Sequence, residues 1–131
     1  NNALILGSGG ASKAVKFVLN NLNINSRFVS RKPTTKSLGY KNLSSATIAS
    51  HKLIINTTPL GTYPNINSLP SIPYEGITKE HILFDLVYNP DETAFLTKGK
   101  MMGCIIKNGR EMLELQAEKS WAIWNTISPK I

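Results

Sequence analysis

The sequence predicts an α/β fold, a doubly wound parallel sheet of about five strands with helices on both faces. Short apolar runs alternate with longer segments whose apolar residues recur at helical spacing, which is typical of a parallel sheet with right-handed crossovers. Glycine, proline and asparagine mark the turns between these segments. The 131 residues suffice for one domain with a core and leave little room for a second. Residues 1–131 are therefore expected to form a single domain.

Five strands are expected, and each is a short segment that contains an apolar pair or run and is bounded by turn residues. A continuous apolar run is typical of a buried strand in a parallel sheet, because both of its faces are covered. The strands are expected at residues 3–6, 27–30, 53–55, 82–87 and 104–106. In a dinucleotide-binding sheet their order in space would be 3-2-1-4-5.

The segments between and after the strands carry helical signals. Residues 11–22 and 109–124 place their apolar side chains at helical spacing. A shorter helix is expected to run through Ile48 behind a pair of serines, either of which would cap it. Another is expected to begin at Asn89-Pro90, because proline suits the first helical position.

The charged residues are unevenly distributed. The net charge is +7, yet all eight acidic residues lie at or after Glu75. A basic half of this kind could meet nucleic acid, a membrane surface or a phosphorylated small molecule. No run approaches the roughly 20 apolar residues of a membrane span. His51 and His81 are expected at the surface, and with one cysteine they offer no metal-ligand spacing.

The junction between the first strand and the first helix is rich in glycine, since residues 7–11 are Gly-Ser-Gly-Gly-Ala. Gly7 is expected to permit a tight turn, and Gly9 to let a phosphate approach the backbone. The helix start adds free N–H groups and the positive end of the helix dipole. Lys13 does not make this a P-loop, because a serine precedes it and the loop is too short. The junction predicts a dinucleotide pyrophosphate site in a Rossmann-type fold, with ordinary turn chemistry as the alternative.

The end of the second strand indicates which dinucleotide binds. An NAD site places an acidic residue there, about 20 residues beyond the glycines, to accept a hydrogen bond from the ribose 2′-hydroxyl. This chain has no acidic residue before Glu75 and carries Ser30-Arg31-Lys32 in that place. Fixed cations suit a 2′-phosphate, and a guanidinium can also stack on adenine. The turn predicts NADP rather than NAD, with a solvated basic turn as the alternative.

Three further motifs lie at the ends of later strands. Residues 56–61 are Asn-Thr-Thr-Pro-Leu-Gly, residues 85–90 are Asp-Leu-Val-Tyr-Asn-Pro, and residues 109–117 contain Gly-x-x-Met-Leu-x-x-Gln-Ala. Together with the glycine junction and the basic turn, they resemble the C-terminal, NADP-binding domain of shikimate dehydrogenase over nearly the whole chain. Ser30 and Lys32 depart from this resemblance, because the family usually has asparagine and threonine there.

The resemblance implies a role for each matching residue. Tyr88 and Gln116 would face the substrate. The family's catalytic lysine and aspartate belong to an N-terminal substrate domain, so the resemblance implies no catalytic residue in this chain, and it implies no metal. The residues implied to bind NADP are Gly7, Gly9, Gly10, Ala11, Ser30, Arg31, Lys32, Asn56, Thr57, Thr58, Val87, Gly109 and Met112.

The resemblance also implies the reaction of the parent enzyme. That reaction is the reversible, NADPH-dependent reduction of 3-dehydroshikimate to shikimate, a cytoplasmic step towards chorismate and the aromatic amino acids. The chain begins at Asn1, without methionine, directly ahead of a strand, so a fragment of a longer two-domain enzyme is expected. Such a fragment would share its small-molecule substrate with the missing domain, would be inactive alone, and would meet neither nucleic acid nor a membrane.

Alternative functions remain open from the sequence. An NAD-linked quinate/shikimate dehydrogenase would need an acidic residue after the second strand, where the chain has none. Another dehydrogenase with a similar nucleotide domain, such as glutamyl-tRNA reductase, leaves Tyr88 and residues 109–116 unexplained. A nucleotide-sensing or nucleic-acid-binding module without chemistry of its own is the third alternative.

Overall fold

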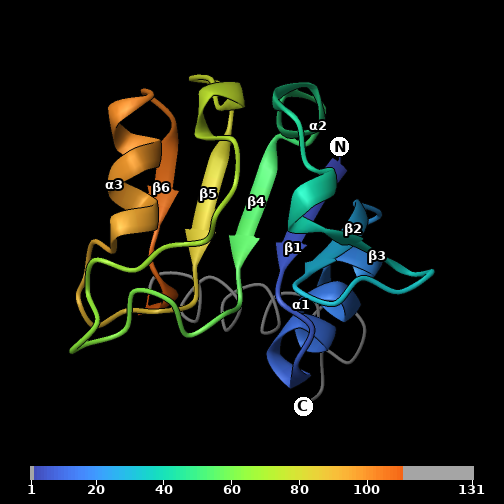
Figure 1. Cartoon of the computed structure of the whole chain (residues 1–131), viewed down its shortest axis with the longest axis horizontal. Helices are drawn as coiled ribbons and strands as arrows, with labels where there is room; N and C mark the ends of the chain where they lie inside the picture. Colours follow the sequence, from blue (N-terminus) through green and yellow to red (C-terminus); the bar gives the residue numbers. More distant parts are fainter. Residues whose placement is uncertain (1, 111–131) are drawn as a thin grey trace, which may run out of the picture.

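The computed structural model describes residues 2–110, and in this part of the chain six parallel strands form one sheet in the order β3-β2-β1-β4-β5-β6 (Figure 1). The α/β prediction is thereby confirmed. The strands are β1 (Asn2–Leu6), β2 (Asn25–Ser30), β3 (Ser37–Gly39), β4 (Leu53–Asn56), β5 (Ile82–Asp85) and β6 (Ile105–Lys107).

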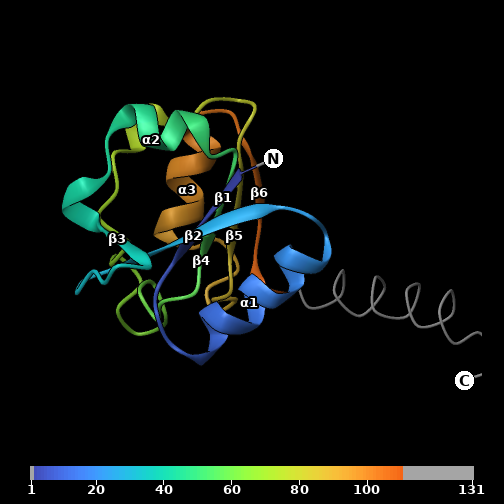
Figure 2. The same cartoon turned by 90° about the vertical axis from the view of Figure 1, so that its right-hand side faces the viewer.

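Helices cover both faces of the sheet, as the sequence predicts. Helix α1 (Gly10–Asn21) lies on one face, whereas α2 (Ser45–Ser50) and α3 (Ala94–Met101) lie on the other (Figure 2). Two short 3-10 turns, η1 (Tyr40–Asn42) and η2 (Tyr74–Gly76), lie in the connections. No helix in this part of the chain is both long and apolar enough to cross a membrane.

The buried apolar residues form two clusters, one on each side of the sheet. Strand β1 contributes to both, because successive side chains of a strand point to opposite faces. Ala3 and Ile5 pack towards α1, Leu4 and Leu6 pack towards α2 and α3, and all four are fully buried. The centre of the sheet is thus fixed by β1, and the glycine junction begins where this buried strand ends.

The sheet contains one strand more than predicted. Residues Ser37–Gly39, which lie outside the five expected strands, pair with β2 at the edge of the sheet. The segment expected as the third strand is β4, and it lies beside β1 rather than beyond β2. The order of the five expected strands therefore differs from the predicted 3-2-1-4-5, because the additional strand β3 occupies the place beyond β2. The short strand Ser-Leu-Gly has no apolar run that could predict it.

Helix α3 begins later than predicted. Its first residue is Ala94 rather than Pro90, and Thr93 caps it, because the Thr93 hydroxyl accepts a hydrogen bond from Leu96 N at 3.2 Å. Threonine is a favoured cap because its side-chain oxygen satisfies an N–H group of the first turn. At α2, Ser44 provides the same contact to Thr47 N, so one of the two expected serines is the cap.

Both histidines are buried, so the expectation of surface positions is wrong. His81 is fully buried, with its Nδ1 accepting from Thr78 N at 3.0 Å and its Nε2 donating to Ile48 O at 2.8 Å. His51 Nδ1 lies 2.7 Å from Thr47 O. The His81 ring links the residue before β5 to Ile48 of α2, and the His51 ring contacts the last turn of α2. Buried polar groups of this kind need such partners.

Candidate functional site

The carboxyl ends of β1, β4 and β5 lie side by side at the edge towards which their arrows point (Figure 1). Leu6 of β1 lies opposite Asn56 of β4, and Asn56 lies opposite Asp85 of β5. The chain leaves β1 through α1 on one face and leaves β5 through α3 on the other. Ligands of open α/β sheets bind at such a change of direction, outside the carboxyl ends of the strands. This edge is the candidate site.

The glycine junction directly follows β1 and forms its part of this edge. Gly7 has φ +122°, a conformation that glycine adopts readily, and its N–H donates to Val29 O at 2.8 Å. A Cβ on Gly7 would overlap the Thr57 hydroxyl. In contrast, a Cβ on Gly9 or Gly10 would meet no atom within 4 Å. Gly7 is therefore required by the turn and by close packing, whereas Gly9 and Gly10 face open space that a ligand could fill.

The start of α1 is free of competing anions. Gly9 is the N-cap residue, no side chain caps the helix, and its first turn contains no acidic residue. The first N–H groups of a helix lack partners within the helix and attract anions. Ser12 is fully buried and donates from Oγ to Gly9 O at 2.6 Å, so a small residue packs here as close helix–strand contact requires. The geometry suits a phosphate group.

The basic turn after β2 lies next to the glycine junction, because Gly7 is hydrogen-bonded to Val29. Arg31 and Lys32 are exposed there. Burial raises the pKa of the Tyr40 phenol, and the nearby Arg31 charge partly opposes this rise. Ser30 is buried, and its Oγ donates to Lys32 O at 3.0 Å. The structure thus leaves two cations open at the turn, while the serine holds the turn together.

The threonines after β4 turn their hydroxyls towards the protein. Thr57 Oγ1 donates to Leu6 O at 2.6 Å, and Thr57 N donates to the same oxygen at 2.9 Å. Thr58 donates to Asn56 Oδ1 from Oγ1 at 2.6 Å and from N at 3.1 Å. These contacts fasten the β4 turn against β1, so the structure gives Thr57 and Thr58 a shaping role at the edge.

A buried polar cluster lies beneath the edge between β4, β5 and α3. Asn56, Asp85 and Thr93 are fully buried. Asp85 Oδ1 accepts from Asn56 Nδ2 at 3.1 Å and from Val87 N at 3.0 Å, and its Oδ2 accepts from Thr93 Oγ1 at 2.6 Å. Burial raises the pKa of Asp85 to about 6, although its hydrogen bonds with Thr93, Val87 and Asn56 favour the charged form. Neither Asp85 nor Thr93 was among the predicted site residues.

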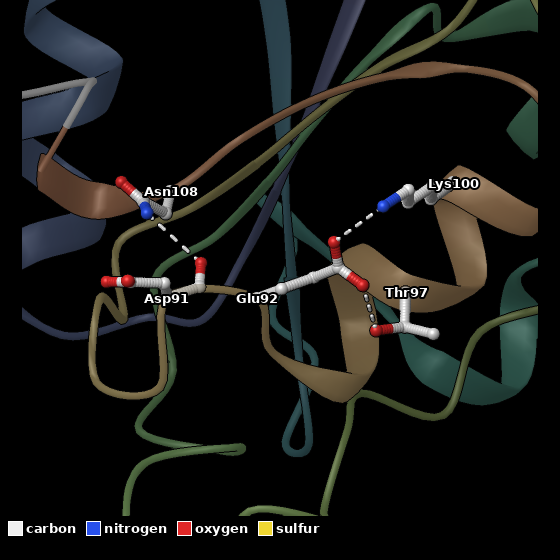
Figure 3. Close-up of polar contacts among 5 residues, drawn as sticks. All are labelled: Asp91, Glu92, Thr97, Lys100 and Asn108. Atoms are coloured by element: carbon white, nitrogen blue, oxygen red, sulfur yellow. Dashed lines mark hydrogen bonds and ion pairs between the residues drawn. The ribbon is translucent and has the colours of Figure 1, made fainter.

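The loop after β5 is fastened to the chain that follows β6. Asn108 Nδ2 donates to Asp91 O at 3.0 Å (Figure 3). The Arg110 guanidinium lies 3.8 Å from Asp91 Oδ1 and 6.0 Å from the centre of the Tyr88 ring. Tyr88 is 49% exposed. The predicted substrate-facing ring therefore lies at the candidate edge with its position supported from the neighbouring segment.

A second set of contacts holds the loop to α3. Glu92 accepts from Thr97 Oγ1 at 2.8 Å and pairs with Lys100 Nζ at 3.3 Å (Figure 3). The Thr97 hydrogen bond, followed by the Lys100 contact, lowers the pKa of Glu92. The exposed pair contributes little to stability, but it limits where the loop can lie.

Val87 and Gly109 meet through their backbones. Gly109 N donates to Val87 O at 3.4 Å, and a Cβ on Gly109 would overlap the carbonyl oxygen of Leu86. Glycine at this position therefore lets the segment after β6 approach the end of β5. Met112 and Gln116, the other residues predicted from this motif, lie outside the described residues 2–110. Within those residues no group of three side chains could hold a metal ion.

Comparisons with known proteins show which proteins this chain is similar to. No protein-family model matches the chain. The chain is 38% identical to shikimate dehydrogenase (NADP(+)) of Methanococcus aeolicus and 42% identical to that of Methanococcus maripaludis. Each alignment covers 99% of this chain and 51% of the relative. The chain therefore spans about half the length of the curated relatives it matches.

Solved structures share the fold. A shikimate dehydrogenase in complex with NADP+ has a TM-score of 0.71 and 28% identity, and the match covers 95% of this chain and 49% of that one. Shikimate 5-dehydrogenase from Thermus thermophilus, in complex with NADP(H) and shikimate, has a TM-score of 0.73 and 27% identity over the same shares. In sequence and in fold, the chain matches the C-terminal, NADP-binding half of the shikimate dehydrogenases.

Proposed function

We propose that residues 1–131 are the NADP(H)-binding domain of a shikimate dehydrogenase, which reversibly reduces 3-dehydroshikimate to shikimate in the cytoplasm. The observation that carries the proposal is the meeting of three motifs at one sheet edge, in a chain similar to these enzymes along 99% of its length. The motifs are the glycine junction, the basic turn at Arg31 and the Asp85–Pro90 segment.

The residues at the edge fit NADP. Open space at Gly9 and Gly10, together with the uncapped start of α1, accommodates the pyrophosphate. Arg31 and Lys32 are exposed cations beside that junction, and the strand before them ends without a carboxylate. Cations there favour the 2′-phosphate of NADP over the ribose hydroxyls of NAD. When bound, NADPH supplies the hydride for reduction of the ketone.

The proposed chemistry needs a second domain. Tyr88 offers a half-exposed phenol at the edge, and we assign it, with Gln116, to the substrate side of the cleft. The acid–base groups that transfer the proton would come from the half of the enzyme that this chain does not span. The chain would then bind the hydride donor, NADPH, and form one wall of the substrate cleft. This cleft would be complete only when both halves of the enzyme are present.

Calorimetry with NADP+ and NAD+ tests the cofactor assignment. We expect NADP+ to bind at least tenfold more tightly, about 1.4 kcal/mol, which is within the range of one charge-assisted contact. Arg31→Ala should remove most of this preference. Lys52→Ala is the matched control, because it also removes one exposed cation. Lys52 lies just before the amino end of β4, whereas the candidate site lies at the carboxyl ends of the strands. Equal affinities of the unmodified chain for both dinucleotides would contradict the proposal.

A further inference from the structure

The buried carboxylate of Asp85 joins the two loops that form the candidate edge. It receives one hydrogen bond from Asn56 at the end of β4 and one from Val87 in the loop after β5. A third comes from Thr93, the cap of α3. The backbones of β4 and β5 are paired as far as Asn56 and Asp85, and this side chain adds contacts that connect the turns beyond the paired residues.

The contacts have a defined direction. An ionised carboxylate only accepts hydrogen bonds, so Asn56 must present its NH2 group to Asp85. The Asn56 oxygen then faces the other way and accepts from the N–H and the hydroxyl of Thr58. Asp85 thereby orients Asn56, and Asn56 in turn holds Thr58 in the turn after β4. Thr57 of the same turn packs against Gly7. Neutralising Asp85 weakens the contacts to Asn56 and Val87, because charge-assisted hydrogen bonds are about twice as strong as neutral ones.

We propose that Asp85 is a positioning residue, whose ionised carboxylate holds the β4 turn and the start of the β5 loop in the arrangement that binds the nucleotide. Nucleotide binding weakens when this carboxylate is neutralised. The inference rests on the proposed function, because it assumes that the ligand at this edge is a dinucleotide.

The carboxylate titrates in an accessible range. Burial places the pKa of Asp85 at about 6, and the groups that oppose this rise are its three hydrogen-bond donors. The titratable group that interacts with it from η2 is Tyr74, whose pKa burial raises above the usual 10.0 of a tyrosine, so that phenol stays uncharged between pH 5 and pH 8. Glu92 precedes α3, and Lys98 and Lys100 lie on it, and all three are exposed. At pH 5 about one tenth of the chains carry ionised Asp85, so affinity should fall about tenfold when the neutral form binds at least tenfold more weakly.

Titration calorimetry of the 131-residue chain with NADP+ from pH 5 to pH 8 tests the inference. The ligand's own 2′-phosphate also titrates near pH 6, so the informative quantity is the difference between variants measured with the same ligand. We expect the affinity of the unmodified chain to fall about tenfold more than that of Asp85→Asn on going from pH 7.5 to pH 5. The same measurement with NAD+, which lacks the 2′-phosphate, should show the difference again.

A second pair of variants covers the case in which Asp85→Asn does not fold. Thr93→Val removes a hydrogen bond that lowers the pKa of Asp85, so the midpoint of the affinity profile should move to higher pH. Thr93→Ser keeps the hydroxyl and should leave the midpoint in place. A purely structural role for the cluster would change stability without moving this midpoint.

The outcomes separate the inference from the proposed function. Binding of NADP+ with the same pH dependence in the unmodified chain and in Asp85→Asn overturns the inference alone. An unmoved midpoint in Thr93→Val does the same. Absence of binding to NADP+ and NAD+ at every pH overturns the proposed function, and the inference with it.

Discussion

Replacing Asp85 by asparagine should change how the stability of the chain depends on pH. Burial raises the pKa of Asp85 from its usual 3.8 to about 6. The folded chain therefore holds this proton more tightly than the unfolded chain does, and the resulting stabilisation is present in acid and lost as the pH rises through 6. The full difference amounts to about 3 kcal/mol, of which roughly half is lost between pH 5 and pH 7.5.

Urea unfolding of the two proteins at several pH values in this window measures the effect. All other titrating groups are shared, so the change in the difference between the two free energies of unfolding isolates Asp85. We expect the unmodified chain to lose about 1–2 kcal/mol relative to Asp85→Asn from pH 5 to pH 7.5. A difference that stays constant with pH would refute the reasoning, because it would mean that Asp85 has the same pKa in the folded and unfolded chain.

Three further predictions concern the edge of the sheet and the missing half of the enzyme. Gly9→Val should abolish binding of NADP+ while leaving the circular dichroism spectrum unchanged, because its side chain would occupy the open space at α1; binding with unchanged affinity would contradict the pyrophosphate assignment. Gly109→Ala should destabilise the chain by about 2–4 kcal/mol in urea unfolding, because its Cβ overlaps the Leu86 carbonyl, and an effect below 0.5 kcal/mol would show that this contact relaxes freely. The chain alone should form no NADPH from shikimate in a spectrophotometric assay, because hydride transfer needs a proton donor within reach of the carbonyl oxygen; turnover would place an acid–base group within residues 1–131.

The features predicted correctly are those that the local sequence determines. The glycine junction combines an apolar strand, a turn that requires glycine and a helix start within about ten residues, so the sequence predicts its shape without knowledge of the rest of the fold. The five expected strand segments are likewise found as strands, because each contains apolar residues bounded by turn residues, although Ile105 of the edge strand β6 is 55% exposed. Exposed Arg31 could be placed because it directly follows such a strand.

The features that were missed depend on contacts between distant segments. Asp85 and Asn56 lie 29 positions apart and meet only because β4 and β5 pair in register. His81 contacts Ile48 across 33 positions, so its burial cannot be deduced from its own neighbours in the sequence. Strand β3 is short and weakly apolar, and it forms because β2 offers it an edge. Such positions are set by tertiary pairing rather than by propensity.

The strand order has a consequence for how the sheet is assembled. Strands β1 to β3 extend in chain order on one side, and β4 to β6 extend in chain order on the other, so two sequential half-sheets meet at the β1–β4 seam. The glycine junction belongs to the first half, whereas Asn56 and Asp85 belong to the second. The dinucleotide proposed here would contact both halves and act as a staple across the seam. Since a ligand at free concentration L that binds only the joined form stabilises that form by RT ln(1 + L/Kd), nucleotide binding should strengthen the cohesion of the two half-sheets.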